Sequence, residues 1–236
     1  MEIKIQTSEE LSLLLEGLKD EIISANSYHR LFRGLVNSMP AHEREFQQSY
    51  VFWYLTMEAL QDAGRVNLCR IYDQNSTSLN LVNLLHTIKA NLHFFSEVHF
   101  RKRLEGNAFV DSLAQVNRVP KMDELERDIE SVSCKNPIVE KLMIWRNNIV
   151  AHRGAKISLG KKKILENNPL SQREIEQLLE HSLETFNKYS SLYQASTLST
   201  QNLILGHDDY KALLGFISLG LKKWDEDTSK PFNFGS

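Results

Sequence analysis

The chain has 236 residues, of which 42% are hydrophobic and 25% are charged. These values fit one large globular unit, or one unit with an appendage, and exclude a fibrous or low-complexity chain. The formal net charge is -2 at pH 7. No global basic field therefore draws the protein to nucleic acid, and any such site must be local.

The chain carries no sign of export or of membrane insertion. Its first residues, Met1–Ile5, lack an apolar signal core, and no run approaches about 18 apolar residues. Cys69 and Cys134 are far apart and have no CxxC or His-rich neighbours, which is typical of free thiols in a reducing compartment. We therefore expect a soluble, cytoplasmic protein with no membrane partner.

The first half of the chain predicts three helices. Thr7-Ser8-Glu9-Glu10 has the pattern of a capping box, and apolar residues follow it at helical spacing as far as Asn37–Pro40. A second helix is expected from Tyr50 to Asp73, and its apolar residues cover so much of its circumference that we expect it to be central. A third helix covers Leu79–Phe95. Residues Arg101–Pro120 are expected to be irregular, with Arg101, Lys102 and Arg103 as a solvated basic run.

The second half predicts further helices. One covers Met122–Ser131, and the next begins with Pro137 in its first turn and ends at Gly154. Lys156–Pro169 is expected to be a basic loop or short hairpin. Ser171-Gln172-Arg173-Glu174 is a second capping box. It begins a long helix whose inward residues are expected to be Ile175, Leu178, Leu179, Phe186, Tyr189 and Tyr193.

A last helix is expected from about Asp208 to Trp224, and no segment alternates with period two as a strand does. The pattern predicts an all-α fold, an antiparallel helical bundle with additional C-terminal helices. We expect residues 1–200 to form the bundle domain, 201–225 a C-terminal helix packed on it, and 226–236 a flexible tail.

The segment Trp145–Gly154 places charged side chains where core residues are expected. At about 100° per residue, Ile138–Arg153 presents a broad apolar arc with Arg146 and Arg153 near its middle. An uncompensated charge at a core position costs several kcal/mol. These arginines are therefore expected to face a cleft, a carboxylate partner or a subunit boundary.

Arg146, the polar Asn147, four residues and then His152 resemble the motif of HEPN domains, and more narrowly the abortive-infection proteins of the Abi-U type. The aromatic-rich helix ending Arg70-Ile71-Tyr72-Asp73, followed by Ser78-Leu79 and a leucine run, adds to this resemblance, which covers roughly residues 10 to 200. The resemblance implies a HEPN-like bundle and a homodimer whose motifs face each other. It also implies a role in phage defence or as a toxin, with room for an antitoxin or defence-system partner. One HEPN subgroup has Tyr two residues after the His, but Gly154 stands here, which disfavours that subgroup.

The chemistry of this motif suits RNA cleavage without a metal or cofactor. His152 can move a proton near neutral pH, and Arg146 can stabilise charge on phosphorus with its planar fork. Asn147 would orient the phosphate or hold the helix end. On an α-helix Arg146 and His152 are about 9 Å apart along the axis, so two antiparallel copies or a kink would help. The alternative is structural: Arg146 pairs with a buried carboxylate, and His152 caps the helix C-terminus.

Other charged residues have two interpretations each. Arg153 and the run Lys161, Lys162 and Lys163 are candidate RNA contacts, or else solvated surface. Glu58, Asp62 and Arg65 share one helix face, either as a network that supports Arg146 or Arg153, or as a solvated stripe. Arg70 and Asp73 are expected to form an ordinary helix-end pair.

No metal site is expected, because among His86, His93, Glu97 and His99 only His93 and Glu97 have ligand spacing. Two further functions stay open. One is a non-catalytic dimeric module that binds RNA, nucleotide or a protein partner, and the other is a purely structural helical subunit.

Overall fold

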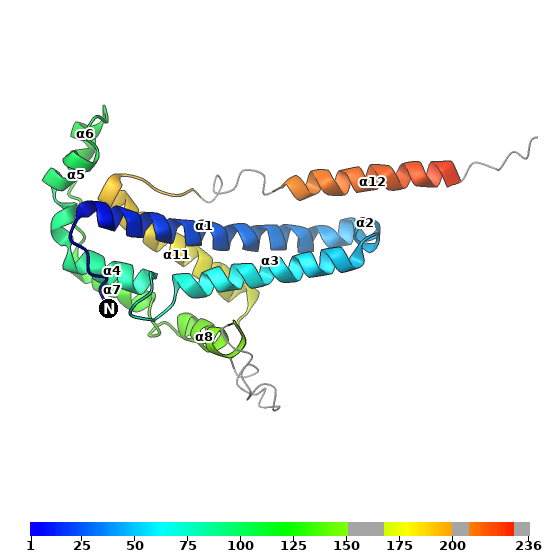
Figure 1. The fold of residues 1–236 in the computed structure, drawn as a ribbon, viewed down its shortest axis with the longest axis horizontal. Coiled ribbons are helices and arrows are strands. Elements are labelled where there is room, and N and C mark those ends of the chain that lie inside the picture. The colour runs from blue at the N-terminus through cyan, green and yellow to red at the C-terminus, as the bar shows by residue number, and fades with distance from the viewer. Residues whose placement is uncertain (151–167, 200–207, 229–236) are drawn as a thin grey trace, which may run out of the picture.

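The computed structural model describes residues 1–150, 168–199 and 208–228. Within these ranges the chain is all-α, with helices and no strand, as expected (Figure 1). The α-helices are α1 (Ser8–Ser38), α2 (Glu43–Gln47), α3 (Tyr50–Ile71), α4 (Leu81–Ala90), α5 (Glu97–Arg103), α6 (Val110–Ala114), α7 (Met122–Ser131), α8 (Pro137–Trp145), α11 (Gln172–Gln194) and α12 (Asp209–Thr228). The short 3₁₀ turns are η1 (Met39–Ala41) and η2 (Leu92–Phe95), and the π-helical turn η3 is Arg146–Val150.

Helices α1 and α3 form a long antiparallel hairpin, and α11 packs against both (Figure 1). The capping box that begins α1 is confirmed: the Glu10 amide donates to Thr7 Oγ1 at 3.2 Å, and the Glu10 carboxylate accepts from the Thr7 amide. Such a cap satisfies two of the backbone groups that a helix start leaves unpaired. The rest of α1 follows the predicted apolar spacing as far as Ser38.

The main core lies where α1, the second half of α3, α4 and α11 meet. Each large apolar side chain buried here stabilises the fold by about 1.5–3 kcal/mol. The capping box of Ser171 and Glu174 that begins α11 is confirmed, and so is the inward face of that helix. Core residues include Leu11, Leu18, Ile22, Leu68, Ile71, Leu84, Leu85, Leu178, Phe186, Tyr189 and Tyr193.

Residues Arg101–Pro120 are irregular over most of their length, as predicted, but the end of α5 and the whole of the short α6 also lie in this range. The expectation that Arg103 is solvated is wrong. It stacks 3.7 Å over the Tyr193 ring and donates to the Tyr193 carbonyl at 2.7 Å. Arg118 donates to the Ser191 carbonyl at 2.8 Å. Two arginines thus satisfy carbonyls in the last turn of α11, where the helix dipole favours positive charge.

A second, smaller core lies at the far end of the α1–α3 hairpin. Leu35, Phe46, Trp53 and Leu214 are its buried members, so α12 packs here against α1, α2 and α3. The helix α12 extends to Thr228, beyond the predicted Trp224.

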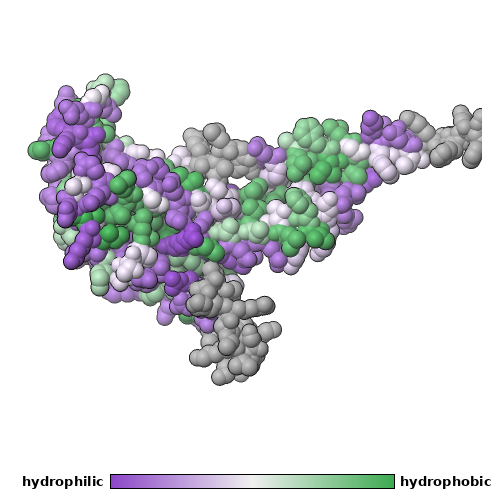
Figure 2. Space-filling model, in the orientation of Figure 1, coloured by the Kyte–Doolittle hydropathy of each residue, from purple (hydrophilic) through white to green (hydrophobic). Residues whose placement is uncertain are grey.

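The first turns of α3 are exposed, so the expectation that this helix is central throughout is wrong. The exposed apolar residues form what we call the α3 apolar face, and hydrophobic atoms gather at this end of the molecule and over α12 (Figure 2). The face consists of Tyr50, Val51, Phe52, Tyr54 and Leu55, which are 45% to 66% exposed. The sequence pattern did not reveal this, because an apolar helix face is the same whether the fold or a partner covers it.

Across the described ranges, no helix combines the length and the apolar content that are needed to cross a lipid bilayer.

Candidate functional site

The motif helix α8 begins as the sequence predicts. Asn136 caps it by accepting from the Ile138 amide at 3.0 Å, and Pro137 occupies the first turn, where its missing N–H leaves no bond unmade. Val139, Leu142 and Met143 are buried in the main core. The position of α8 is therefore set by its apolar face.

The helix changes pitch at Arg146, so the expectation of one α-helix through Arg153 is wrong. Residues Arg146–Val150 form the π-helical turn η3. At this junction the side-chain amide of Asn148 donates to the Ile144 carbonyl at 2.7 Å. π-Helical turns are rare and frequent at functional sites. The rise of an α-helix therefore does not describe Arg146–Val150, and the predicted spacing to His152 lies outside the described residues.

Arg146 is held by a carboxylate of the same chain. Its Nη2 lies 3.3 Å from Oδ2 of Asp73, and its Nη1 donates to Oδ1 of Asn147 at 3.2 Å. The Asp73 side chain is 13% exposed and that of Arg146 is 35% exposed. One part of the guanidinium is thus fixed while another part still reaches the surface. The sequence left open whether Arg146 faces a cleft, a carboxylate partner or a subunit boundary, and among the described residues it has a carboxylate partner, Asp73.

Asp73 is itself rigidly placed by the loop that follows α3. Its Oδ1 accepts from the amides of Gln74 at 2.8 Å and Asn75 at 3.2 Å, and its Oδ2 accepts from Ser78 Oγ at 3.1 Å. Asn83 on α4 braces this loop by donating to the Asn75 carbonyl at 2.7 Å. A carboxylate with this many donors is fixed in orientation and can in turn orient a guanidinium.

The predicted pair of Arg70 with Asp73 is wrong. Arg70 is exposed and lies 3.5 Å from Glu21 on α1, whereas Asp73 turns towards η3. Sequence spacing favoured the local pair because the two residues are three apart. The signal that could have found the real pair was the unexplained charge of Arg146 in an apolar arc, together with an aspartate at the end of the neighbouring helix.

Arg65 and Cys69 lie beside the motif on α3. The Arg65 guanidinium is 5.3 Å from the ring centroid of Trp145, the residue just before Arg146. Burial raises the pKa of the Cys69 thiol to about 12, although Arg146 and Arg65 both lower it and Asp73 raises it. The thiol is therefore inert at neutral pH, and it shows that both arginines are close to one point of the core.

Glu58, Asp62 and Arg65 share a face of α3 but form only one contact among themselves. Glu58 accepts from the Tyr54 hydroxyl at 2.7 Å, and Asp62 is 77% exposed, 3.7 Å from Arg65. Arg65 alone of the three reaches the motif helix, through Trp145.

Of the remaining predicted site residues, one lies in the described part of the chain and the others lie outside it. Asn147 is exposed beside Arg146. His152, Arg153 and the run Lys161, Lys162 and Lys163 lie outside the described residues. In the parts of the chain that the structure covers, no three His, Cys, Asp or Glu side chains gather in a way that could hold a metal ion.

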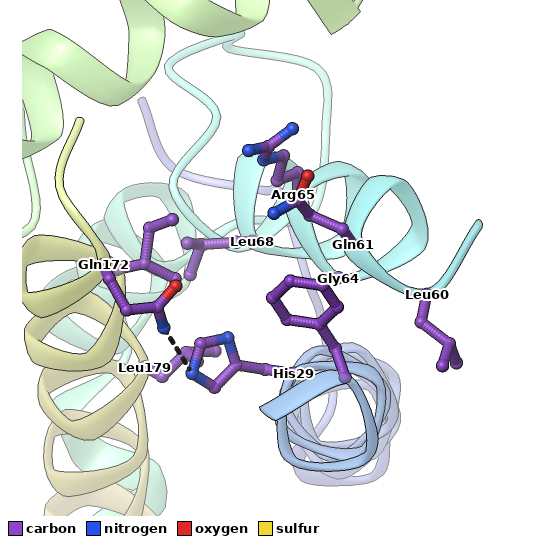
Figure 3. A pocket seen from close by; sticks show the side chains of 10 residues that line it. His29, Leu60, Gln61, Gly64, Arg65, Leu68, Gln172 and Leu179 are labelled. Atoms are coloured by element: carbon purple, nitrogen blue, oxygen red, sulfur yellow. Dashed lines mark hydrogen bonds between the residues drawn. The ribbon is translucent and has the colours of Figure 1, made fainter. Parts of the chain in front are cut away.

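A small cavity of about 20 Å³ lies between α1, α3 and α11, large enough for about one water molecule (Figure 3). His29 and Gln172 face each other across it, with 3.1 Å between His29 Nε2 and Gln172 Nε2. Arg65 borders it, but its guanidinium is turned away from His29 (Figure 3). This cavity does not include Arg146.

The motif helix is also tied to α11 by charge. Lys141 on α8 donates to Glu174 at 2.6 Å, and this bond, with the Ser171 amide, lowers the pKa of Glu174 to about 2. The capping carboxylate of α11 thus also anchors α8.

The family model described as HEPN AbiU2 matches residues 8–213. The chain belongs to the AbiU2 family of HEPN proteins. The match runs from the first residue of α1 into α12, so the buried residues of the main core and the whole Asp73–Arg146 pair lie inside the AbiU2 region, whereas Leu214 of the second core lies just beyond it. No curated protein and no solved structure matches this AbiU2-family chain.

Proposed function

We propose that this AbiU2-family protein is a metal-independent endoribonuclease that acts in the cytoplasm, in phage defence or as a toxin. Support comes from the family and from the motif Arg146…His152. The single observation that carries the proposal is that Arg146, although paired with a buried carboxylate as in the structural alternative, keeps a side chain that is 35% exposed and so open to a ligand. A preorganised cation at a surface is what stabilisation of a phosphorane requires.

In the proposed reaction RNA supplies its own nucleophile. The 2′-oxygen forms a bond to phosphorus as the bond from phosphorus to the 5′-oxygen breaks, which leaves a 2′,3′-cyclic phosphate and a 5′-hydroxyl. A proton leaves the 2′-hydroxyl and a proton reaches the departing 5′-oxygen. His152 carries out one of these transfers and solvent the other, since an imidazole ordinarily titrates near neutral pH. Arg146 binds the non-bridging oxygens as their charge grows. Asn147, bonded to Arg146, orients the same phosphate.

We also propose that two copies associate through the α3 apolar face. The ion pair with Asp73 compensates the charge of Arg146 within one chain, so this arginine alone does not require a second copy. The exposed side chains Tyr50, Val51, Phe52, Tyr54 and Leu55 are a better reason. Together they offer on the order of 500 Å² per copy, against about 800 Å² per partner in a standard interface. The face occupies the first turns of α3, whereas Arg65 is in the second half of this helix and Asp73 follows its C-terminal end, so association through the face does not by itself place the two motifs opposite each other.

The decisive experiment incubates the purified protein with total cellular RNA in EDTA and maps the cleaved ends. Wild type should cleave and leave 2′,3′-cyclic phosphate ends, whereas His152→Ala and Arg146→Ala should not. Arg70→Ala is the matched control, because Arg70 is an exposed arginine paired with Glu21. Cleavage by a folded His152→Ala protein, or a requirement for Mg²⁺ with 5′-phosphate products, would refute this mechanism.

The alternative of a non-catalytic binding module has a distinct outcome in the same experiment. A wild type that retains RNA but leaves every tested RNA intact would favour it, and Arg146 would then be a binding residue held in place by Asp73.

A further inference from the structure

A second arginine lies next to the motif and has no assigned role in the reaction. We propose that Arg65 binds a phosphate group of the RNA, next to the phosphate that Arg146 engages. This inference rests on the proposed function and adds a binding residue to it. The ligand class is a phosphodiester chain, because the proposed RNA substrate carries further phosphates on either side of the one that Arg146 engages.

The first argument is position. Arg65 is on α3, which packs against η3, and its guanidinium lies 5.3 Å from the Trp145 ring centroid. Trp145 directly precedes Arg146 in the chain. Both arginines are close enough to the Cys69 thiol to lower its pKa. Both arginines therefore belong to the region where α3 packs against η3.

The second argument is that none of the neighbouring carboxylates forms a close ion pair with Arg65. The buried carboxylate of the junction, Asp73, is bonded to Arg146. Glu58 accepts from Tyr54. Asp62 is the acid nearest to Arg65, but the separation is 3.7 Å and the carboxylate is 77% exposed, so this pair contributes little. At the junction itself two guanidinium groups face one buried carboxylate, Asp73, while Glu58 and Asp62 keep their charges farther towards solvent.

The third argument is the state of the Arg65 side chain itself. It is 26% exposed, and its buried Nε finds no hydrogen-bond acceptor among the described residues. Partial burial lowers the pKa of the group, but an arginine stays charged at any physiological pH. Contact with Trp145 restricts the planar fork, and its head is turned away from the cavity beside it (Figure 3). The buried Nε cannot reach RNA itself, so phosphate oxygens would be bound through the Nη groups, whose neighbouring acid, Asp62, is as far as 3.7 Å away.

The competing explanation is that Arg65 only stabilises the packing of α8 on α3 through Trp145. If Arg65 had only that role, its replacement would change the stability of the protein but not the salt dependence of RNA binding. A phosphate contact has a separate signature, because each neutralised phosphate adds to the slope of log affinity against log salt concentration.

The test measures binding of a single-stranded RNA over a range of salt concentrations in a His152→Ala background, so that no RNA is cleaved. Arg65→Gln should weaken binding and reduce the salt slope by about 0.7, the value for one phosphate contact on a single strand. Arg65→Lys keeps the charge but loses the fork, so it should keep the slope and lose part of the affinity. Arg70→Gln, on the same helix, should match the background protein.

Two results would overturn the proposal. One is a folded Arg65→Gln protein whose RNA affinity and salt slope equal those of Arg70→Gln. The other applies if Arg65→Gln does not fold, and is an Arg65→Lys protein that binds RNA with undiminished affinity. The outcome is separable from the test of the enzyme. If wild type does not cleave RNA but binding depends on Arg65, the nuclease proposal fails while the phosphate contact stands. If wild type cleaves RNA and replacement of Arg65 leaves RNA binding unchanged, only this inference fails.

Discussion

Arg146 Nη2 and Asp73 Oδ2 lie 3.3 Å apart and join the first residue of η3 to the loop after α3. The two residues are 73 positions apart in the chain. The orientation of the motif arginine therefore depends on the α3–α4 loop, and a change in that loop should affect the motif.

Replacement of Asp73 tests this dependence. Asp73→Asn removes the charge that holds Arg146 but keeps a side chain of similar shape. We expect RNA cleavage to fall by roughly 10- to 100-fold, because small displacements of a positioned group cost that much. The free energy of unfolding should fall by only about 1–2 kcal/mol, since Arg146 is partly exposed. Asp62→Asn is the control, and equal cleavage rates for the two variants would contradict the positioning role.

Neutralisation of Lys161, Lys162 and Lys163 tests the basic run after the motif helix. If all three contact RNA phosphates, their joint replacement by Gln should weaken binding about uniformly across sequences and reduce the salt slope by up to about three phosphate contacts. His152→Ala should do the opposite, with binding kept and cleavage lost. An unchanged slope in the triple variant would mean that the run is solvated surface.

Disruption of the α3 apolar face should separate the copies. Light scattering should report a mass near twice 27.3 kDa for wild type and near 27.3 kDa for Leu55→Asp, because a charge in an apolar interface must be desolvated without a partner. Val98→Asp is the matched control, since Val98 on α5 is 76% exposed but lies outside this face. A monomeric wild type at micromolar concentration, or a dimeric Leu55→Asp, would rule out association through this face.

Stability should fall as the pH drops below about 6.5, partly because of His181. Burial lowers the pKa of this imidazole, which lies 3.1 Å from the hydroxyls of both Tyr72 and Ser131. The folded state thus prefers the neutral ring. Its contribution is complete above the unfolded pKa near 6.5 and is lost as the pH falls towards the lower folded pKa.

Urea unfolding at pH 7.5 and pH 5.5 checks this expectation. His181→Gln should be less stable than wild type at pH 7.5, and it should show a smaller loss between the two values. Part of the loss should remain, because burial also lowers the pKa of His29. An identical pH dependence in the variant and wild type would exclude His181 as a source.

The sequence by itself determined the all-α class, both capping boxes, the start of α8 at Pro137 and the buried face of α11. These features depend on residues within a few positions of one another, and the hydrogen bonds and apolar spacing that specify them are local. The motif residues could also be identified this way, because Arg146, Asn147 and His152 stand on one short segment.

Tertiary structure decided what surrounds that segment. The carboxylate of Asp73, from the loop after α3, meets Arg146. Arg103 and Arg118 are fixed at the end of α11 instead of being solvated, and the first turns of α3 are exposed instead of central. Each outcome depends on which distant helix packs nearby. Helical periodicity states that a face must be covered or a charge compensated, but it carries no information about the partner, because that partner is chosen by long-range packing.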